Sequence, residues 1–289
     1  MKFLVLGAGG QLGREWKRYL EQEGYEHDAF GSSKVDITDR LSVFEALNEN
    51  RPDVVVNCAA YTDVDGAEDH WNEARELNID AVENLANLCS DLNATLVHYS
   101  TDYVFPGRAE DADTYPDGYP ESLTPDPLNN YGLSKFRGEQ KIKQSNADHL
   151  IIRAAWLCGQ FGSNFVKTML RLARERDKLT VVNDQKSAPS LARNVVENSI
   201  ALLESRQRGI YHAASEGLIS WYDYACEIMN QAGIDIEVEP VSSDEFPQEA
   251  RRPAYSKLSI EKLRKVEGAR IIGWKEGLRA LLADLIDDL

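Results

Sequence analysis

The chain has 289 residues, of which 43% are hydrophobic and 28% are charged, and this is the composition of an ordinary globular protein. Acidic residues outnumber basic residues by 48 to 32 and give a formal net charge of -16, which excludes a generally basic surface for nucleic acid or anionic membrane. No apolar run approaches the length of a membrane span, and the 4 cysteines show no metal-binding spacing. We therefore expect a cytoplasmic protein that binds neither nucleic acid nor membrane.

Short apolar runs alternate with amphipathic stretches over the first 150 residues. Strands are predicted at 3–6, 26–30, 53–57, 95–99 and 150–152, and helices at 12–20 and 73–88. Strands that read as short continuous apolar runs are typical of parallel sheets that helices cover on both faces. The alternation therefore predicts an α/β fold with a doubly wound parallel Rossmann sheet over 1–153.

The pattern is looser after residue 155. Helices are predicted at 164–176, 192–203, 220–231 and 277–287, and strands at 179–182 and 209–212. We expect 154–289 to form a smaller α/β substrate-binding lobe, with a segment of about 179–212 returning to the Rossmann domain. The segment 106–130 is rich in Pro, Gly and acids and is too long for a simple connection, so it is expected to be functional or mobile. Its part 106–121 carries five acids and is expected to be a lid or a solvated insertion, with the insertion favoured.

A glycine-rich turn follows the first predicted strand and opens the first helix. Gly7, Gly10 and Gly13 fit the pattern GxxGxxG. Such glycines permit a tight turn and a close approach to a pyrophosphate, and the helix N-terminus supplies N–H groups to the phosphates. A purely structural turn is the alternative, but the position in the first strand–turn–helix unit favours a dinucleotide site.

The end of the second strand carries no acid that would bind the adenosine ribose hydroxyls of NAD. Ser32, Ser33 and Lys34 stand there instead and are able to hydrogen-bond a 2′-phosphate, which favours NADPH and leaves NADH open. A plain polar loop is the alternative. The next loop of a Rossmann sheet lies near the adenine, so a contact from Asp36 and Ile37 is expected.

The pair Tyr131 and Lys135 is the main candidate for catalysis. A spacing of four places both side chains on one face of a helix, where the ammonium is expected to lower the pKa of the phenol and suit it to donate a proton to a carbonyl. The YxxxK pattern alone arises often by chance. It supports a catalytic role here because it follows the fourth predicted strand in a chain that also has the glycine-rich turn. At the tip of that strand, either Ser100 or Thr101 is expected to hydrogen-bond the substrate oxygen, unless it only caps the backbone.

Together these motifs resemble the extended short-chain dehydrogenases and, more closely, the dTDP-4-dehydrorhamnose reductase family. The matching segments cover nearly the whole chain and lie at 7–13, 57–62, 100–105, 127–135, 153–156, 164–170, 182–185, 188–189, 251–253 and 256–258. The resemblance implies NAD(P)H-dependent reduction of the C4 ketone of dTDP-4-dehydro-β-L-rhamnose, the last step of dTDP-L-rhamnose synthesis.

The resemblance also implies roles for individual residues. Tyr131 donates the proton to the forming C4 alkoxide, Lys135 holds the nicotinamide ribose, and Thr101 orients the ketone and the phenol. Sugar contacts are implied for Thr101, Asp102 and Trp156, although a core tryptophan is the alternative for Trp156. Arg251 and Arg252 are candidate donors to a diphosphate, and the family match favours Arg252 over the alternative of a solvated basic pair. The implied cofactor contacts are Gly10, Gln11, Leu12, Asp36, Ile37, Ala60, Tyr61 and Thr62.

The resemblance leaves metal binding and the oligomeric state undecided. Some bacterial relatives dimerise through Mg²⁺ held by carboxylates, and Glu15 matches one such position. Arg193 stands where another carboxylate is expected, which argues against a metal bridge. Both a monomer and a homodimer therefore stay open.

Two other functions compete with a reductase. The regulatory subunit of methionine adenosyltransferase resembles the same family, but such a non-catalytic protein need not keep Tyr131, Lys135 and Thr101 together. The other alternative is a different nucleotide-sugar enzyme, such as an epimerase or dehydratase with tightly held NAD. Dehydratases of this superfamily often carry an Asp-Glu pair after the catalytic threonine, whereas Asp102 is followed here by Tyr103.

Overall fold

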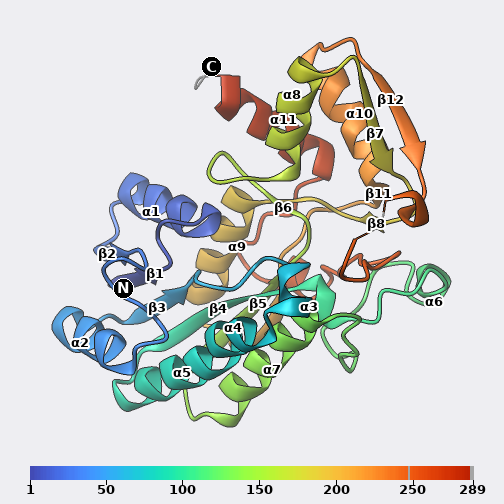
Figure 1. Cartoon of the computed structure of the whole chain (residues 1–289). Coiled ribbons are helices and arrows are strands. Elements are labelled where there is room, and N and C mark those ends of the chain that lie inside the picture. Colours follow the sequence, from blue (N-terminus) through green and yellow to red (C-terminus); the bar gives the residue numbers. More distant parts are fainter. Residues whose placement is uncertain (247, 287–289) are drawn as a thin grey trace.

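A parallel sheet forms the centre of the computed structural model, which describes residues 1–246 and 248–286 (Figure 1). Its strand order is β10-β5-β4-β3-β1-β2, and all neighbours are parallel. The predicted doubly wound α/β fold is confirmed. The order reverses beside β1, and the crevice outside the carboxyl ends of the strands at such a point is where these folds bind ligands. The strands are β1 (Phe3–Leu6), β2 (His27–Phe30), β3 (Val54–Asn57), β4 (Thr95–Thr101), β5 (His149–Ala154) and β10 (Gly209–His212).

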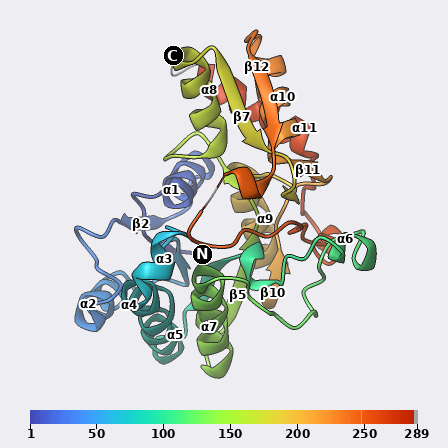
Figure 2. The same cartoon turned by 45° about the vertical axis from the view of Figure 1, so that its right-hand side comes forward.

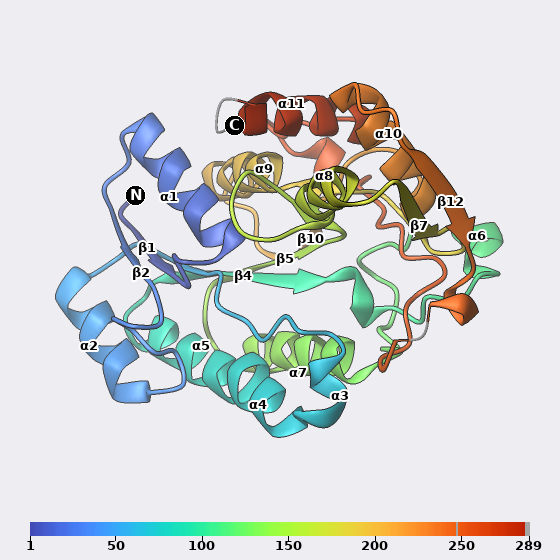
Figure 3. The same cartoon turned by 45° about the horizontal axis from the view of Figure 1, so that its top comes forward.

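Helices cover both faces of this sheet, and Figure 3 shows the two helical layers. The helices α1 (Gln11–Glu23) and α9 (Ala192–Glu204) pack on one face, against a buried cluster that includes Phe3 and Val5 of β1. The alternate residues Leu4 and Leu6 face the other side, because successive side chains of a strand point to opposite faces. That side is covered by α2 (Arg40–Asn50), α5 (Ala81–Asp91) and α7 (Asn130–Gln144).

The helix predicted at 73–88 is interrupted by one wide turn. It comprises α4 (Trp71–Arg75), the π-helical turn η1 (Glu76–Asp80) and α5. Asn78 in this turn accepts a hydrogen bond from the backbone N–H of Tyr61 and donates to the Tyr61 carbonyl and to the Ser134 hydroxyl. It therefore ties the loop after β3 to α7. Such π-turns occur often at functional sites.

A smaller lobe follows β5, and Figure 2 shows it above the sheet domain. Its largest strand pair is β7 (Lys178–Val182) with β12 (Glu237–Val241). Of the segment 179–212 that was expected to return to the Rossmann domain, α9 and β10 lie with the main sheet, whereas β7 pairs within the lobe. The lobe helices are α8 (Phe165–Glu175), α10 (Trp221–Ala232) and α11 (Trp274–Ile286), and the short strands are β6 (Leu157–Cys158), β8 (Lys186–Ser187), β9 (Ser190–Leu191) and β11 (Ile219–Ser220). Residue 287, the last of the predicted helix 277–287, lies outside the described residues.

The interpretation of 106–121 as a solvated insertion was only partly right, because Glu110, Asp113 and Asp117 are exposed whereas Asp111 and Tyr119 are buried. This segment holds α6 (Asp111–Thr114) and follows the short helix η2 (Asp102–Val104). Tyr119 is fully buried and donates a hydrogen bond of 2.6 Å to the buried Asp111 carboxylate. Glu121 accepts from the backbone N–H of His212. Two of the five acids, Asp111 and Glu121, therefore serve as hydrogen-bond acceptors within the protein.

The other short helices connect these parts. They are α3 (Gly66–Asp69), η3 (Ser243–Glu245) and η4 (Leu263–Lys265). Among the described residues, the helices are too short or too polar for any of them to cross a bilayer.

Candidate active site

The carboxyl ends of the central strands and the smaller lobe enclose a cavity of about 710 Å³. It contains three groups that the sequence analysis placed together, namely the start of α1, the tip of β4 and the first turns of α7. The predicted site residues in its wall are Gly10, Gln11, Leu12, Ala60, Thr62, Thr101, Asp102, Tyr131, Lys135 and Trp156. The lobe contributes wall residues that the sequence analysis did not predict, which are Leu157, Gly162, Ser163 and Trp221.

A second cavity of about 320 Å³ adjoins the first, since Gly10, Cys58 and Ala60 line both. It lies beside the end of β2. Its predicted residues are Gly7, Gly10, Ser32, Asp36, Ile37 and Ala60, and its unpredicted ones are Gly9, Val35, Cys58, Ala59 and Leu77. A groove that runs from the end of β2 past the α1 N-terminus to the β4 tip has the path of an extended dinucleotide.

The glycine-rich turn is shaped by close backbone contacts. Gly7 has a φ of +73°, and a Cβ there would lie 2.5 Å from the Ala59 nitrogen. A Cβ on Gly13 would lie 2.3 Å from the Gly7 carbonyl oxygen, so Gly13 serves helix packing and does not line either cavity. Gly10 is the N-cap of α1 and makes no side-chain cap. The N–H groups of the first turn are thus left to an anionic ligand, which fits a pyrophosphate.

The first turn of α7 fixes the position of Tyr131. The N-cap Asn129 accepts from the backbone N–H of Gly132 at 2.8 Å, and its side-chain amide donates to the Arg251 carbonyl. A Cβ on Gly132 would lie 2.1 Å from the Tyr103 carbonyl oxygen, so this glycine lets α7 approach η2 closely. The Tyr131 ring lies edge-on to the Tyr103 ring, with centroids 5.8 Å apart.

The expectation that Lys135 lowers the pKa of Tyr131 was wrong for the ligand-free protein. Burial raises the pKa of Tyr131 to about 12, with Asp102 acting in the same direction and a hydrogen bond with the Thr101 hydroxyl acting against it. The phenol is therefore protonated at neutral pH, as a proton donor must be. Lys135 is not among the groups that shift the pKa of the phenol, and burial lowers the pKa of its own ammonium to about 8.

The tip of β4 presents Thr101 and Asp102 to the cavity. The Thr101 hydroxyl donates to Asp102 Oδ1 at 3.0 Å and accepts from the backbone N–H of Tyr103. Burial raises the pKa of Asp102 to about 6, although the Ser256 and Thr101 hydroxyls act against the rise. Ser100, the other candidate hydroxyl, also lines the cavity, and within the described residues its buried oxygen has no hydrogen-bond partner.

A buried ion pair, which the sequence analysis did not predict, anchors α7 to the sheet one turn beyond Lys135. Arg153 on β5 donates to both carboxylate oxygens of Glu139, at 2.8 and 2.6 Å, and each side chain is 1% exposed. Arg153 also contacts Nε2 of His212 on β10 at 3.4 Å. The pair fixes the helix face that carries Tyr131 and Lys135.

Trp156 begins the connection into the smaller lobe with a left-handed backbone, at a φ of +46°. This conformation is rare for a bulky residue and is typical of positions that the surrounding structure over-determines. Its ring stacks on the ring of Trp221, with centroids 3.4 Å apart. Both rings line the larger cavity and give it a flat apolar wall.

A family model described as "RmlD substrate binding domain" matches residues 1–286. The chain belongs to this family. The spore coat polysaccharide biosynthesis protein SpsK of Bacillus subtilis is 40% identical over 98% of this chain and 97% of the relative. The dTDP-4-dehydrorhamnose reductase of Aggregatibacter actinomycetemcomitans is 36% identical over 98% of both chains. A crystal structure of dTDP-4-dehydrorhamnose reductase from Bacillus anthracis in complex with NADP is 36% identical, has a TM-score of 0.93, and covers 98% of this chain and 99% of that chain.

Three more of the site residues predicted for this RmlD-family chain line neither cavity. Ser33 is exposed at the end of β2, and the backbone of Tyr61 is held by Asn78. Arg252 pairs with the Asp65 carboxylate at 2.6 Å, and its second terminal nitrogen is buried without a hydrogen-bond partner among the described residues. Arg252 thus has one nitrogen held by the loop after β3 and another without a partner.

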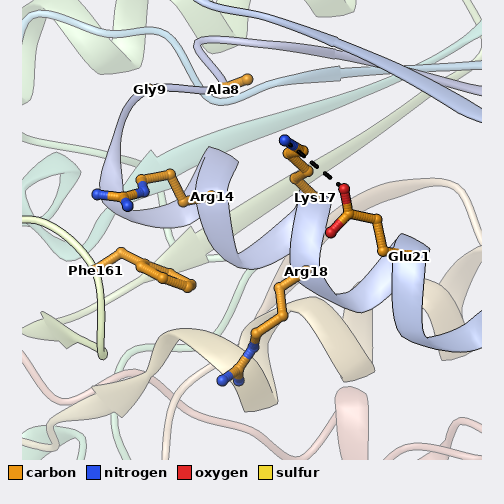
Figure 4. Close-up of a pocket in the computed structure, with 7 residues that line it drawn as sticks. All are labelled: Ala8, Gly9, Arg14, Lys17, Arg18, Glu21 and Phe161. Carbon is orange, nitrogen blue, oxygen red and sulfur yellow. Dashed lines mark ion pairs between the residues drawn. The ribbon is translucent and has the colours of Figure 1, made fainter. Parts of the chain in front are cut away.

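Basic side chains cluster on α1 beside the glycine turn, and Figure 4 shows them around a separate hollow. The guanidinium groups of Arg14 and Arg18 both lie near the Phe161 ring, at 4.7 and 5.8 Å from its centroid. Lys17 forms an ion pair with Glu21. This hollow and the smaller ligand cavity share Gly9, so the cations lie close to the expected path of the dinucleotide.

Glu15 lies in a mixed cluster of acids and arginines and not in a carboxylate cage. The buried Glu15 carboxylate accepts from Arg18, and Asp284 lies 3.9 Å from both Arg18 and Arg193. The two arginines already neutralise the two carboxylates. Within 1–246 and 248–286, no group of three or more His, Cys, Asp or Glu side chains is placed to hold a metal ion.

Chelation is expected to leave the protein unchanged, because Arg18 and Arg193 already pair with the Glu15 and Asp284 carboxylates. Treatment with EDTA should shift the Tm by less than about 1 °C, since only a ligand that binds the native state stabilises it. Differential scanning fluorimetry with and without added Mg²⁺ measures this directly. A fall in Tm on chelation that Mg²⁺ restores would contradict the arginine-neutralised cluster.

Proposed function

We propose that this chain is a dTDP-4-dehydrorhamnose reductase that uses NADPH to reduce the C4 ketone of dTDP-4-dehydro-β-L-rhamnose to dTDP-L-rhamnose. One observation carries the proposal. Thr101 at the end of β4 and the pair Tyr131 and Lys135 on α7 line the same cavity as the glycine turn of α1. A proton donor, its orienting hydroxyl and a dinucleotide-binding turn are the parts that reduction of a carbonyl needs.

The roles of the side chains follow from this arrangement. A bound reduced nicotinamide supplies the hydride. Tyr131 holds the proton on its Oη and delivers it to the C4 oxygen as negative charge develops there. Thr101 directs the ketone oxygen toward the phenol, and Lys135 contacts the nicotinamide ribose. The stacked Trp156 and Trp221 exclude water from one wall and present an apolar surface to a deoxysugar.

The diphosphate of the sugar nucleotide is assigned to Arg252. One of its terminal nitrogens is buried without a partner among the described residues, and the other is oriented by Asp65. A guanidinium binds phosphate oxygens with geometric precision when its plane is fixed. Asp65 is thus a positioning group for Arg252.

The cytoplasmic location and the choice between monomer and homodimer stay predictions.

A coupled assay tests the function against both alternatives. NADPH oxidation at 340 nm should depend on this protein and on dTDP-4-dehydro-β-L-rhamnose made in situ by the preceding enzymes. A non-catalytic regulatory subunit would bind NADPH without oxidising it. An epimerase or dehydratase would convert a nucleotide sugar without net consumption of added NADPH. Either of these results would overturn the reductase proposal.

Cofactor preference is expected to depend on the end of β2. Lys34→Ala should raise the Kd for NADPH about three- to tenfold and leave the Kd for NADH nearly unchanged, because only NADPH carries the 2′-phosphate. Lys143→Ala, at the far end of α7, makes the same change in net charge away from the site. Calorimetric titration of both cofactors checks this. Equal weakening of NADPH and NADH binding would show that Lys34 does not read the 2′-phosphate.

A further inference from the structure

His98 is a fully buried titratable side chain that the proposed reaction does not use. It lies on β4 with 0% exposure. Its Nε2 is 3.4 Å from Lys135 Nζ, and its Nδ1 is 3.2 Å from the side-chain nitrogen of Asn57. Both partners belong to segments that build the cofactor groove. The tautomer of His98 determines whether Nε2 donates a hydrogen bond to Lys135 or accepts one from it.

The hydrogen-bond network fixes the tautomer. The backbone N–H of Ala59 donates to Asn57 Oδ1 at 3.1 Å, so the amide oxygen of Asn57 faces Ala59 and its nitrogen faces His98. An amide nitrogen only donates, so Nδ1 of His98 must accept. Burial and the nearby Lys135 lower the pKa of His98 well below its ordinary value, so the ring is neutral. A neutral ring that accepts at Nδ1 carries its hydrogen on Nε2.

The Nε2–H group therefore points at Lys135. An ammonium has no lone pair to accept this hydrogen, whereas a neutral amine has one. The Glu139 carboxylate raises the pKa of Lys135 but does not cancel the effect of burial, and both of its oxygens are bonded to Arg153. The other titratable groups around Lys135 are the Cys58 thiol and the Tyr131 phenol, and burial raises the pKa of both, so they are uncharged. Burial and the Nε2–H group of His98 thus favour the neutral form of Lys135, whereas Glu139 and Cys58 act in the opposite direction.

We propose that His98, held as the Nε2–H tautomer by Asn57, biases Lys135 toward the neutral amine in the cofactor-free protein, so that cofactor binding at alkaline pH is accompanied by uptake of a proton at Nζ. The inference rests on the proposed role of Lys135 at the nicotinamide ribose. The proton comes from solvent. His98 is a positioning residue, since it acts on the cofactor through Lys135.

The second buried histidine shows the contrasting arrangement. Nδ1 of His212 lies 3.1 Å from the Ser259 carbonyl oxygen, which only accepts, so this nitrogen carries the hydrogen. Its Nε2 is then free to accept from Arg153 at 3.4 Å. The network around His212 therefore suits a permanently charged guanidinium. The two buried histidines are expected to be opposite tautomers beside the two buried cations.

The pH dependence of cofactor affinity tests the proposal. The pKa of Lys135 is about 8 in the free protein and is expected to be higher in the complex, where the ammonium binds hydroxyls. The proton on Lys135 thus favours the complex, and the Kd for NADPH should rise as pH increases through about 8. Calorimetry at pH 8.5 in buffers of different ionisation enthalpy should also report net proton uptake.

His98→Gln is the decisive variant. Glutamine is neutral and reaches the position of Nε2, but it can turn an oxygen toward Lys135 and accept from the ammonium. The alkaline rise in Kd should shift upward by about one pH unit, and the proton uptake at pH 8.5 should fall. His212→Gln is the matched control and should leave the midpoint in place. Cys58→Ser shows that the midpoint does not come from the thiol.

The outcomes separate this proposal from the proposed function. If Lys135→Met leaves the NADPH affinity and its pH dependence unchanged, the proposed role of Lys135 fails. If Lys135→Met weakens binding but His98→Gln keeps the wild-type midpoint, the role of His98 is overturned. ¹⁵N NMR of histidine-labelled wild-type protein needs no variant to fold and should show one buried histidine of each tautomer. Finding both as Nδ1–H would also overturn the proposal.

Discussion

Replacement of Tyr131 by phenylalanine is expected to lower kcat about 10²- to 10⁴-fold, because the reaction loses its general acid. The phenol hydroxyl is the one atom removed, and the ring keeps its edge-on contact with Tyr103. The Kd for NADPH should therefore stay within about twofold of wild type, a change of under roughly 0.5 kcal/mol. Steady-state rates at 340 nm and calorimetric titration measure the two quantities separately.

Tyr103→Phe is the matched control for this prediction. It removes the same atom from the adjacent ring in the same cavity. We expect less than about a tenfold loss of kcat, because Tyr103 does not transfer a proton in the proposed mechanism. A Tyr131→Phe variant that keeps more than a tenth of the wild-type kcat would rule out Tyr131 as the proton donor.

Replacement of Arg153 by methionine is expected to destabilise the protein by about 3–5 kcal/mol, because it leaves the Glu139 carboxylate buried without its charged partner. Both side chains are 1% exposed, so water cannot substitute for the guanidinium. In a chain of this size, the loss corresponds to a fall in Tm of about 10 °C. Thermal unfolding followed by circular dichroism measures it.

The double variant Arg153→Met with Glu139→Gln separates the charge from the packing. Removing the unpaired carboxylate should recover part of the lost stability, because a neutral amide is less costly to bury than a charge. An exposed pair provides the comparison. Arg171→Met breaks a surface ion pair with Glu175, and its effect should be below about 1 kcal/mol. Similar Tm values for the Arg153 and Arg171 variants would refute the large contribution to stability predicted for the buried pair.

Local chemistry explains why much of the site could be predicted from the sequence. The turn between β1 and α1 needs residues without side chains at particular positions, because a Cβ there would clash with nearby backbone. The spacing of the glycines therefore reveals the turn in the sequence. Tyr131 and Lys135 lie four apart on one helix, so their shared face follows from helical periodicity. The carboxyl end of β4 faces the crevice of any doubly wound sheet, which placed Thr101 and Asp102 correctly.

The rest of the site depends on contacts between distant segments. His98 reaches Lys135 from another element, and its tautomer depends on a backbone N–H after β3. A histidine inside the otherwise apolar run 95–99 was the signal that could have marked it. Trp221 stacks on Trp156 across 65 positions of sequence that carry no periodic pattern linking them. Asp111 and Glu121 were expected to be solvated because composition does not reveal that Tyr119 and His212 donate to them.

Tyr131 and Lys135 line one cavity as expected, but the electrostatic expectation drawn from their spacing was wrong. Spacing placed the ammonium near the phenol, but it carried no information about burial. Desolvation raises the pKa of the phenol and lowers that of the ammonium, and it is the largest cause in both cases. The sequence therefore identified the catalytic candidates but not their protonation behaviour in the ligand-free protein.

Transfer of an isotopic label tests the central claim most directly. NADPH carrying deuterium on the transferred position of C4 is incubated with this protein and dTDP-4-dehydro-β-L-rhamnose, and the sugar product is analysed by NMR and mass spectrometry. The account predicts dTDP-L-rhamnose with deuterium bound to C4 of the sugar. NADPH that binds while the sugar remains unlabelled and unreduced would contradict it.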